Sequence, residues 1–321
     1  MALAIKEKNI SIVILSHNRC EDVKKNLITL LTPDVAVDEI IVVDNASTDQ
    51  TRPMLAEITA EHQKLRVVLL EKNLGVAGGR NAGFNIASGK YVVSLDDDSS
   101  IDPKEIKRVP EIFARYPKAG ILAFRIIHPK TGCCQNEHGN YPTPVANHHG
   151  AGFAVRRVVF EKVGTIDEKC AFGAEELDLC IKAHSSGYQT IYIPDLVILH
   201  NSRIPVDKEN FRRRKLRVYN YIRTNYKYFP EPTASLFSFR YTARHFLSAF
   251  RLFGFLKAFS LLPDALRGRN DGLLNHQPVN LPTLRFYKSP GLWPDFGSIP
   301  LTTSLNTVIK KKIARYLSHA E

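Results

Sequence analysis

Three consecutive carboxylates, Asp96-Asp97-Asp98, end an apolar run and are the sharpest chemical feature of the sequence. Carboxylates placed side by side repel one another unless a positive charge lies between them. Mg²⁺ and Mn²⁺ supply such a charge, and they commonly take one or two carboxylates together with substrate phosphates. A solvated acidic turn also explains a bare triplet. The position at the end of a strand-like run favours a cation site.

Two further acidic segments could act beside such a cation. Asp44 follows four apolar residues and opens the segment 44–49, which reads Asp-Asn-Ala-Ser-Thr-Asp. These residue types favour helix-capping turns, and Asp44 could also accept a hydrogen bond from a pyrimidine ring N–H. Glu175-Glu176-Leu177-Asp178 opens a predicted helix. Acids there either complement the helix dipole or provide a general base.

A histidine and a glycine-rich segment complete the candidates. His200 ends the last apolar run before the basic part of the chain. Most lone histidines are surface or core residues, although imidazole is also the commonest metal ligand. Residues 73–83 read NLGVAGGRNAG and lead into a helix. Glycines and a helix N-terminus favour phosphate, but no GxGxxG follows the first strand, so this is not a dinucleotide fingerprint.

The elements that must position these residues alternate between strand and helix. Unbroken apolar runs predict strands that are covered on both faces, and the intervening segments predict helices. This alternation implies right-handed βαβ units and a largely parallel sheet, with ligands at the carboxyl ends of its strands. The polar clusters should therefore meet at one edge. The predicted strands are Ile10–Leu15, Ile40–Val43, Val67–Leu70 and Tyr91–Leu95, and the predicted helices are about 21–31, 50–63 and 77–88.

The remaining chain divides near residue 203. We expect an α/β domain at 1–202 and a basic, mainly helical region at 203–321. Residues 128–150 are rich in Gly, Pro, Asn and His and predict a loop over the site. From about 268 the chain is rich in Pro and Gly without a sustained period, before a short basic helix near 304–317. The other predicted elements are helices near 103–115, 156–163 and 175–186, and strands at Ile121–Phe124, Gly152–Val155, Thr190–Ile193 and Val197–Leu199.

Composition indicates a globular protein with an uneven charge. The chain has 321 residues, of which 44% are hydrophobic and 24% charged, values that are ordinary for a globular domain. We expect no signal peptide and no membrane span. The five cysteines form no framework, which favours reduced thiols in the cytoplasm. Residues 1–202 hold 23 Lys and Arg against 25 Asp and Glu, whereas residues 203–321 hold 21 against 7. Such a basic region typically meets polyanions, lipid phosphates or a phosphorylated ligand.

Several segments, taken in order, resemble glycosyltransferase family 2 with the GT-A fold. They are SIVILSHNR, IIVVDNASTDQT, NLGVAGGRNAGFNIASGKYVVSLDDD, GAGFAVRRVVFEKVG, EELDLC and VILH, and together they cover about residues 9–200. The resemblance implies a Rossmann-like, mixed but mostly parallel sheet flanked by helices. It also implies an inverting transferase that uses a nucleoside-diphosphate sugar and Mn²⁺ or Mg²⁺.

The resemblance also assigns roles to positions of this chain. The donor-binding residues would be Ser16, His17, Asn18, Asp44, Arg80, Asn81, Asp96, Asp97, Gly150 and Gly152. Asp96 and Asp98 would form the DxD pair, with Asp98 the more direct metal ligand and Asp96 nearer the ribose. His200 would complete the metal or diphosphate site. The sugar would be a hexose or deoxyhexose, and Asp44 suits uracil or thymine better than guanine.

The catalytic base departs from the family pattern, which is Glu-Asp, one residue, then Asp. Here Glu176 stands where the family has the Asp base. Glu reaches one methylene further and can perform the same proton transfer, so we expect Glu176 to be the base, with Asp178 in reserve. The acceptor would be a saccharide or a lipid-linked hydroxyl in bacterial glycan biosynthesis.

Alternative functions and partners remain open. A sugar nucleotidyltransferase would need a glycine-rich loop after the first strand, where Ser16-His17-Asn18-Arg19 stands. Basic and aromatic residues at 211–229 could bind nucleic acid, although a solvated basic helix explains them as well, and we expect no nucleic-acid partner. The C-terminal basic helices could rest on the inner face of the plasma membrane. Alternatively, the stripe of Phe239, Phe246, Phe250 and Phe253 packs on the catalytic domain or across a homodimer.

Overall fold

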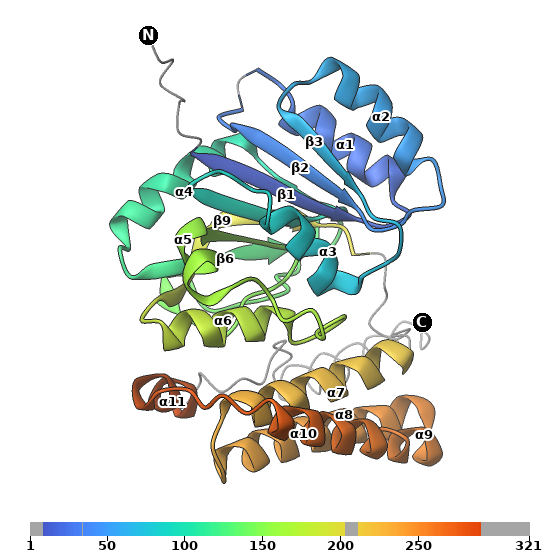
Figure 1. Ribbon diagram of the computed structural model, residues 1–321, viewed down its shortest axis with the longest axis vertical. Helices are drawn as coiled ribbons and strands as arrows, with labels where there is room; N and C mark the ends of the chain where they lie inside the picture. The colour runs from blue at the N-terminus through green and yellow to red at the C-terminus, as the bar shows by residue number, and fades with distance from the viewer. Residues whose placement is uncertain (1–8, 34, 203–210, 290–321) are drawn as a thin grey trace, which may run out of the picture.

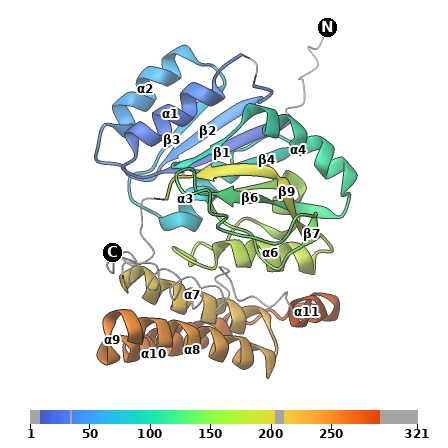
Figure 2. The same cartoon turned by 180° about the vertical axis from the view of Figure 1, so that it is seen from behind.

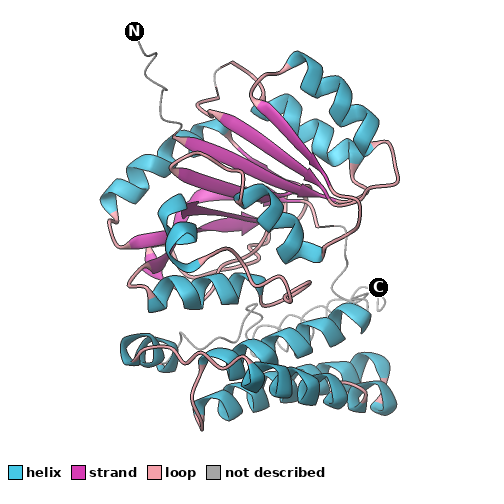
Figure 3. Cartoon of the chain, in the orientation of Figure 1, coloured by secondary structure: helices cyan, strands magenta, loops and turns pink. Residues whose placement is uncertain are grey.

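The computed structural model describes residues 9–33, 35–202 and 211–289 (Figure 1). Helices lie on both sides of one sheet, and a further group of helices lies beyond it (Figure 3). The strands are β1 (Ile10–Ser16), β2 (Glu39–Asp44), β3 (Leu65–Leu69), β4 (Tyr91–Asp96), β5 (Ser99–Ile101), β6 (Ala119–Ile127), β7 (Thr143–Pro144), β8 (Gly152–Arg156) and β9 (Gln189–His200). The helices are α1 (Cys20–Leu30), α2 (Thr51–Glu61), α3 (Gly75–Phe84), α4 (Pro103–Arg115), α5 (Arg157–Val163), α6 (Glu175–Ser185), α7 (Phe211–Tyr228), α8 (Thr233–Phe253), α9 (Phe255–Phe259), α10 (Leu262–Leu274) and α11 (Leu281–Lys288).

One mixed sheet organises the chain as far as His200. Its strand order is β3-β2-β1-β4-β8-β6-β9-β5, and β7 pairs with β9 off this path. The first four strands in this order are parallel, as are β6 and β9, whereas β5, β7 and β8 pair antiparallel. The predicted α/β class, with a mixed, mostly parallel sheet and a helical C-terminal region, is confirmed.

The apolar strands contribute side chains to two separate cores, because successive side chains of a strand point to opposite faces of the sheet. Ile12 and Ile14 of β1 pack with helices α1, α2 and α4. Val13 between them packs with α3, α5 and α6 on the other face. Both faces are covered, which is why the strands read as unbroken apolar runs.

The glycine-rich segment brings helix α3 close to the sheet. A Cβ at Gly79 would lie 2.4 Å from Leu15 Cδ1, and one at Gly83 would lie 2.4 Å from Val13 Cγ1. Only glycine permits this approach. The segment therefore serves helix–sheet packing, and it places Arg80 of the same helix in a buried position.

The C-terminal helices form a third core together with α6. Leu177 and Ile181 of α6 pack with Val218 and Ile222 of α7 and with residues of α8 and α9. Helix α6 thus belongs to two cores, one against the sheet and one against the C-terminal helices. In α7 the side chains of Tyr221, Tyr226 and Tyr228 are buried in this core, so these rings offer no surface on which nucleic-acid bases could stack.

The stretch from about residue 268, where the sequence shows no sustained period, is helical over much of its described part. Helix α10 continues to Leu274, and α11 follows it. A Cβ at Gly268 would lie 2.4 Å from the Tyr219 carbonyl oxygen, and one at Gly272 would lie 2.6 Å from the Arg223 carbonyl oxygen. These glycines therefore allow α10 to lie directly on the backbone of α7, instead of breaking the helix.

The last sheet elements also differ from the prediction. The two strands predicted at Thr190–Ile193 and Val197–Leu199 form one strand, β9, whose pairing with β6 shifts register after Ile193. Pro194 lacks the N–H that a regular ladder needs at this point. The short strands β5 and β7 were not predicted.

Two other expectations concern the C-terminal part of the chain. The predicted boundary near residue 203 and the basic helix near 304–317 lie outside the described residues. Among the helices that the structure does describe, none combines the length and apolarity needed to cross a bilayer.

Candidate active site

Three polar turns meet at the carboxyl edge of the parallel strands. Ser16 at the end of β1 pairs in register with Asp44 at the end of β2, and Leu15 pairs with Asp96 at the end of β4. Just beyond these strands, Asn18 and Ala46 adopt left-handed backbone conformations, with φ of 55° and 61°. Non-glycine residues rarely adopt this conformation outside functional sites and tight turns.

The turn after β1 joins the other two turns. Asn18 donates its backbone N–H to Ser47 Oγ at 2.9 Å, and its side-chain Oδ1 accepts from the Thr48 N–H at 2.7 Å. On the other side, the His17 N–H donates to Asp97 Oδ2 at 3.3 Å. The predicted residues Ser16, His17 and Asn18 therefore stand between the Asp44 turn and the acidic triplet.

Asp44 is fully buried, yet it keeps an unused acceptor. Its Oδ2 accepts from Arg52 Nε at 2.7 Å and from the Ser47 N–H at 3.2 Å. Its Oδ1 has no hydrogen-bond partner among the described residues. A buried acceptor without a donor costs free energy, so this oxygen is suited to a donor from a bound ligand.

The short strand β5 brings the acidic triplet to His200. Ser99 of β5 lies opposite His200 of β9 in the antiparallel ladder, and Asp98 immediately precedes that strand. His200 Nε2 lies 3.2 Å from Asp98 Oδ1. One ligand atom from each of Asp96, Asp98 and His200 lies within 4.8 Å of the others.

The orientation of His200 favours a metal ligand. Gln135, in the loop before β7, lies with Oε1 2.7 Å from His200 Nδ1. Because that oxygen only accepts, Nδ1 donates to it and Nε2 faces the Asp98 carboxylate. At this separation Nε2 and Asp98 Oδ1 share either a proton or a cation. Two carboxylates and one imidazole fit Mn²⁺ or Mg²⁺.

The triplet also carries an excess of negative charge. Burial, followed by the charges of Asp98 and Asp96, raises the pKa of Asp97 to about 7. Asp98 differs, because the hydrogen bond and charge of His200 and the charge of Arg19 outweigh its burial and lower its pKa. Asn26 of α1 holds this turn, since its Nδ2 donates to the carbonyl oxygens of Asp97 and Ser99, each at 2.8 Å.

Arg80 joins the acidic triplet to the first turn of α6. Its Nη2 lies 2.7 Å from Asp96 Oδ1 and 2.7 Å from the Gly150 carbonyl oxygen, while its Nη1 lies 3.5 Å from Glu176 Oε1. A Cβ at Gly150 would lie 2.1 Å from that Glu176 oxygen. Glycine is therefore needed at position 150 for Glu176 to approach Arg80.

Glu175 and Glu176 begin α6 directly after Ala174, which adopts a left-handed φ of 69°. Burial, followed by the charge of Glu176, raises the pKa of Glu175 to about 8. Burial also raises the pKa of Glu176, although the charge of Arg80 opposes this shift. A carboxylate with a raised pKa is better matched to proton abstraction near neutral pH.

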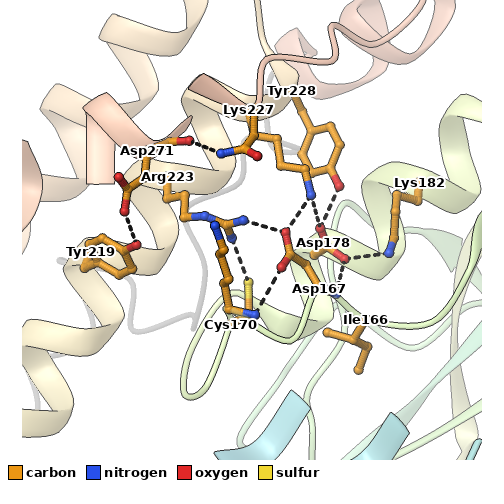
Figure 4. A network of polar contacts seen from close by, with 12 residues as sticks. Ile166, Asp167, Cys170, Asp178, Lys182, Tyr219, Arg223, Lys227, Tyr228 and Asp271 are labelled. Carbon is orange, nitrogen blue, oxygen red and sulfur yellow. Dashed lines mark hydrogen bonds and ion pairs between the residues drawn. The ribbon is translucent and has the colours of Figure 1, made fainter. Parts of the chain in front are cut away.

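Asp178 lies in a different environment, at the junction between α6 and α7 (Figure 4). Its Oδ1 accepts from the Tyr228 hydroxyl at 2.6 Å, and its Oδ2 lies 2.8 Å from Lys182 Nζ. Neighbouring Asp167 binds Arg223 and Lys227 of α7, each at 2.6 Å. These two aspartates and their partners form what we call the junction network.

Two residues that the resemblance assigns to the donor, Asn81 and Gly152, also contact the protein itself. Asn81 forms two hydrogen bonds with the Ile166 backbone, at 2.7 and 3.0 Å, and so holds the loop that leads to α6. A Cβ at Gly152 would lie 2.7 Å from Ile198 Cγ1 of β9. Sequence reasoning did not find Gln135 or Asn26, whose residue types carry no signal in irregular or helical segments.

Comparison with known proteins gives a consistent match. The model of the family described as Glycosyl transferase family 2 matches residues 11–178. The succinoglycan biosynthesis protein ExoO of Rhizobium meliloti is 28% identical over 106 residues, which are 33% of this chain and 30% of that protein. The match thus spans about a third of the length of that curated relative.

Two solved structures share the fold. Residues 1–349 of S. aureus TarS, in complex with UDP-GlcNAc, superpose with a TM-score of 0.57 and 16% identity, over 84% of this chain and 82% of that one. The mannosyltransferase PcManGT from Pyrobaculum calidifontis, in complex with GDP-Man and Mn²⁺, gives a TM-score of 0.56 and 18% identity, over 91% and 89%.

Proposed function

Since this chain belongs to glycosyl transferase family 2, we propose that it transfers a sugar from a nucleoside-diphosphate sugar to an acceptor hydroxyl, with inversion of the anomeric configuration. The observation that carries the proposal is the meeting of three groups at one sheet edge. These are the unused Asp44 oxygen, the set of Asp96, Asp98 and His200, and Glu176, which Arg80 links to Asp96.

Asp44 sits at the nucleobase end of this proposed site. Its free Oδ1 accepts the ring N–H of uracil or thymine, and the turns at Ser16, His17 and Asn18 border the base. This arrangement favours UDP or dTDP sugars over GDP sugars. The TarS complex with UDP-GlcNAc supports a uridine donor, while the PcManGT complex with GDP-Man records a guanosine donor on the same fold.

Asp98, Asp96 and His200 would hold a divalent cation, with Asp96 also nearer the ribose. Bound there, Mn²⁺ or Mg²⁺ offsets the negative charge that develops on the departing nucleoside diphosphate. Arg80 holds Asp96 in place and adds a fixed positive charge beside it. Gln135 fixes the His200 ring, so that Nε2 faces the acidic residues.

Glu176 is the proposed general base. Its carboxylate takes the proton of the acceptor hydroxyl as that oxygen attacks the anomeric carbon on the face opposite the leaving group. Attack from that face inverts the configuration. Asp178 is the reserve candidate, but both its oxygens are engaged at the junction with α7. We therefore propose that Asp178 positions the helix that carries Glu176.

The acceptor class and the biosynthetic process are inferred from a relative and from the cysteines. ExoO, a succinoglycan biosynthesis protein, supports a role in bacterial polysaccharide or glycoconjugate synthesis, with a saccharide or lipid-linked acceptor. All five cysteines are free thiols, which supports the cytoplasmic side of the membrane. We propose a hexosyl- or deoxyhexosyltransferase.

The proposal is tested with Glu176→Gln. Loss of the base should lower the transfer rate by about 10²–10⁴-fold, while the shift in melting temperature caused by a UDP sugar with Mn²⁺ persists. Glu161→Gln on the surface of α5 is the matched control and should leave both readouts unchanged. Full activity in Glu176→Gln would remove this residue from the mechanism. If no UDP, dTDP or GDP sugar raises the melting temperature of the wild type, the donor class itself is wrong.

A further inference from the structure

The C-terminal helices expose an unusual amount of apolar surface. Of the 18 large hydrophobic side chains that are exposed among the described residues, 13 lie between 236 and 281. They include Phe239, Leu256 and Leu266, which are 72%, 84% and 61% exposed. Proteins rarely display so many exposed apolar side chains in one region unless another surface covers them.

These side chains form stripes along the helices. On α8, Leu236, Phe239, Leu247 and Phe250 recur at helical spacing, while Phe237 and Tyr241 of the same helix are buried in the core shared with α7. Leu262, Leu266 and Leu273 form a similar stripe on α10. Helix α7 lies between the sheet domain and helices α8, α9 and α10 (Figures 1 and 2). The stripes therefore face away from the catalytic domain, and together with α9 we call them the outer apolar face.

The charge around this face selects its partner. Residues 211–289 contain 15 Lys and Arg against three Asp and Glu. Arg251, Lys257 and Arg269 are exposed on these helices. The Lys257 ammonium also lies over the Phe253 ring, and the Arg269 guanidinium lies over the Tyr226 ring of α7. Two copies of such a face would repel each other, whereas an anionic lipid surface is complementary to it. Exposed Phe and Leu interspersed with cations are typical of helices that lie in a membrane interface.

We infer that the outer apolar face docks on the surface of an anionic lipid bilayer. The Phe and Leu side chains enter the headgroup region, and the cations contact lipid phosphates. This inference stands apart from the proposed transfer reaction, because none of its residues contacts the sheet edge.

Vesicle cosedimentation of the full chain tests the inference. Wild-type protein should bind vesicles of equimolar phosphatidylglycerol and phosphatidylcholine, and bind phosphatidylcholine alone much more weakly. Combining Phe239→Ser with Leu256→Ser should weaken binding by about tenfold or more, because two exposed apolar side chains no longer enter the interface. Combining Ile28→Ser with Tyr141→Ser is the matched control, since these two side chains of the sheet domain are 63% and 80% exposed, close to the values of the test pair, and it should bind like the wild type.

Two further variants test the electrostatic contribution to vesicle binding. Arg251→Gln and Arg269→Gln should each weaken binding to the phosphatidylglycerol vesicles by about fivefold, and salt should weaken wild-type binding further. Absence of wild-type binding to these vesicles would overturn the inference, as would equal losses in the serine variants and their control. If sedimentation equilibrium instead finds a dimer that the Phe239→Ser, Leu256→Ser variant abolishes, and vesicles do not bind, the face is a self-interface and the inference is wrong.

Discussion

The sheet edge and the α6–α7 junction both gather carboxylates that are at least partly buried, but in opposite electrostatic settings. At the edge, Asp96, Asp97 and Asp98 stand together with fewer cations than carboxylates within reach. At the junction, Asp167 and Asp178 are saturated by two lysines, an arginine and a tyrosine hydroxyl (Figure 4). The same residue type therefore serves two purposes within one domain.

The pKa values record this difference. Burial and the neighbouring carboxylates raise the pKa of Asp97 to about 7. Asp167 is half-buried, but hydrogen bonds from Lys227 and Arg223 outweigh burial and hold its pKa well below the usual range. A cluster with more negative than positive charge is one that a ligand or cation can complete. A cluster that is already neutralised contributes to structure.

The largest effect that separates the two clusters should come from Asp98→Asn. Loss of a proposed metal ligand should lower the transfer rate by about 10²–10³-fold. Thermal stability should fall slightly, because the uncharged side chain loses the contacts with His200 and Arg19 that hold the pKa of Asp98 down. Transfer assays, thermal unfolding and titration calorimetry of Mn²⁺ measure the rate, the stability and the metal affinity. Asp195→Asn, on the exposed side of β9, is the control. Normal Mn²⁺ affinity in Asp98→Asn would contradict the assignment of the acidic edge.

The next largest effect should be on stability, at the junction. Asp178→Asn should lower the free energy of unfolding by about 3 kcal/mol, because removing one buried charge leaves its cationic partners uncompensated. Asp97→Asn is the matched substitution at the edge, and it should stabilise the fold, since Asp97 is buried beside two like charges. Denaturant unfolding measures both variants. Equal destabilisation by the two variants would remove the distinction between the clusters.

The edge cluster could be predicted from the sequence because its residues directly follow apolar strands. Asp44 ends β2, and the acidic triplet begins at the last residue of β4. Parallel strands have their carboxyl ends at the same edge of a sheet. The contact between Asp98 and His200 could not be predicted from apolar runs. It depends on β5, a strand of three residues, which is too short to produce a recognisable period. Only the family resemblance indicated that His200 acts beside the acidic triplet.

The junction network was invisible for a different reason. Asp178 reads as a helix-dipole acid, and Arg223 and Lys227 read as part of a basic helix, whereas Asp167 carries no signal in the sequence. Pairing them requires knowing that α7 packs against α6, a long-range contact that no local pattern encodes. The role of Gly268 is hidden for the same reason, because it depends on how closely α10 lies on the backbone of α7.

A smaller effect is expected on the pH dependence of stability. It should have opposite signs for Glu175, which lies beside Glu176 and feels the charge of Asp96 at the edge, and for Asp167 at the junction. The pKa of Glu175 is raised to about 8 in the folded protein, from an ordinary value of 4.5. Folded protein therefore holds a proton that the unfolded chain releases, so the contribution of Glu175 to stability increases as pH falls from about 8 toward about 4.5. The slope from one such group is at most about 1.4 kcal/mol per pH unit. Asp167, whose pKa is lowered, contributes stability above the ordinary Asp range and loses it as pH falls below that range.

Glu175→Gln isolates the raised group, because it removes the titration and keeps the shape of the side chain. Urea unfolding at several pH values between 5 and 8, on the wild type and the variant, gives the two slopes. The free energy of unfolding of the wild type, minus that of the variant, should increase toward lower pH across this window. The subtraction removes the opposite contribution of buried histidines such as His148 and His184, whose pKa values burial lowers to about 3. Asp167→Asn should leave this slope intact, because Asp167 stays ionised in both states across the window. If Glu175→Gln leaves the slope unchanged while Asp167→Asn alters it, the excess of negative charge lies at the junction, and the contrast between the two clusters is reversed.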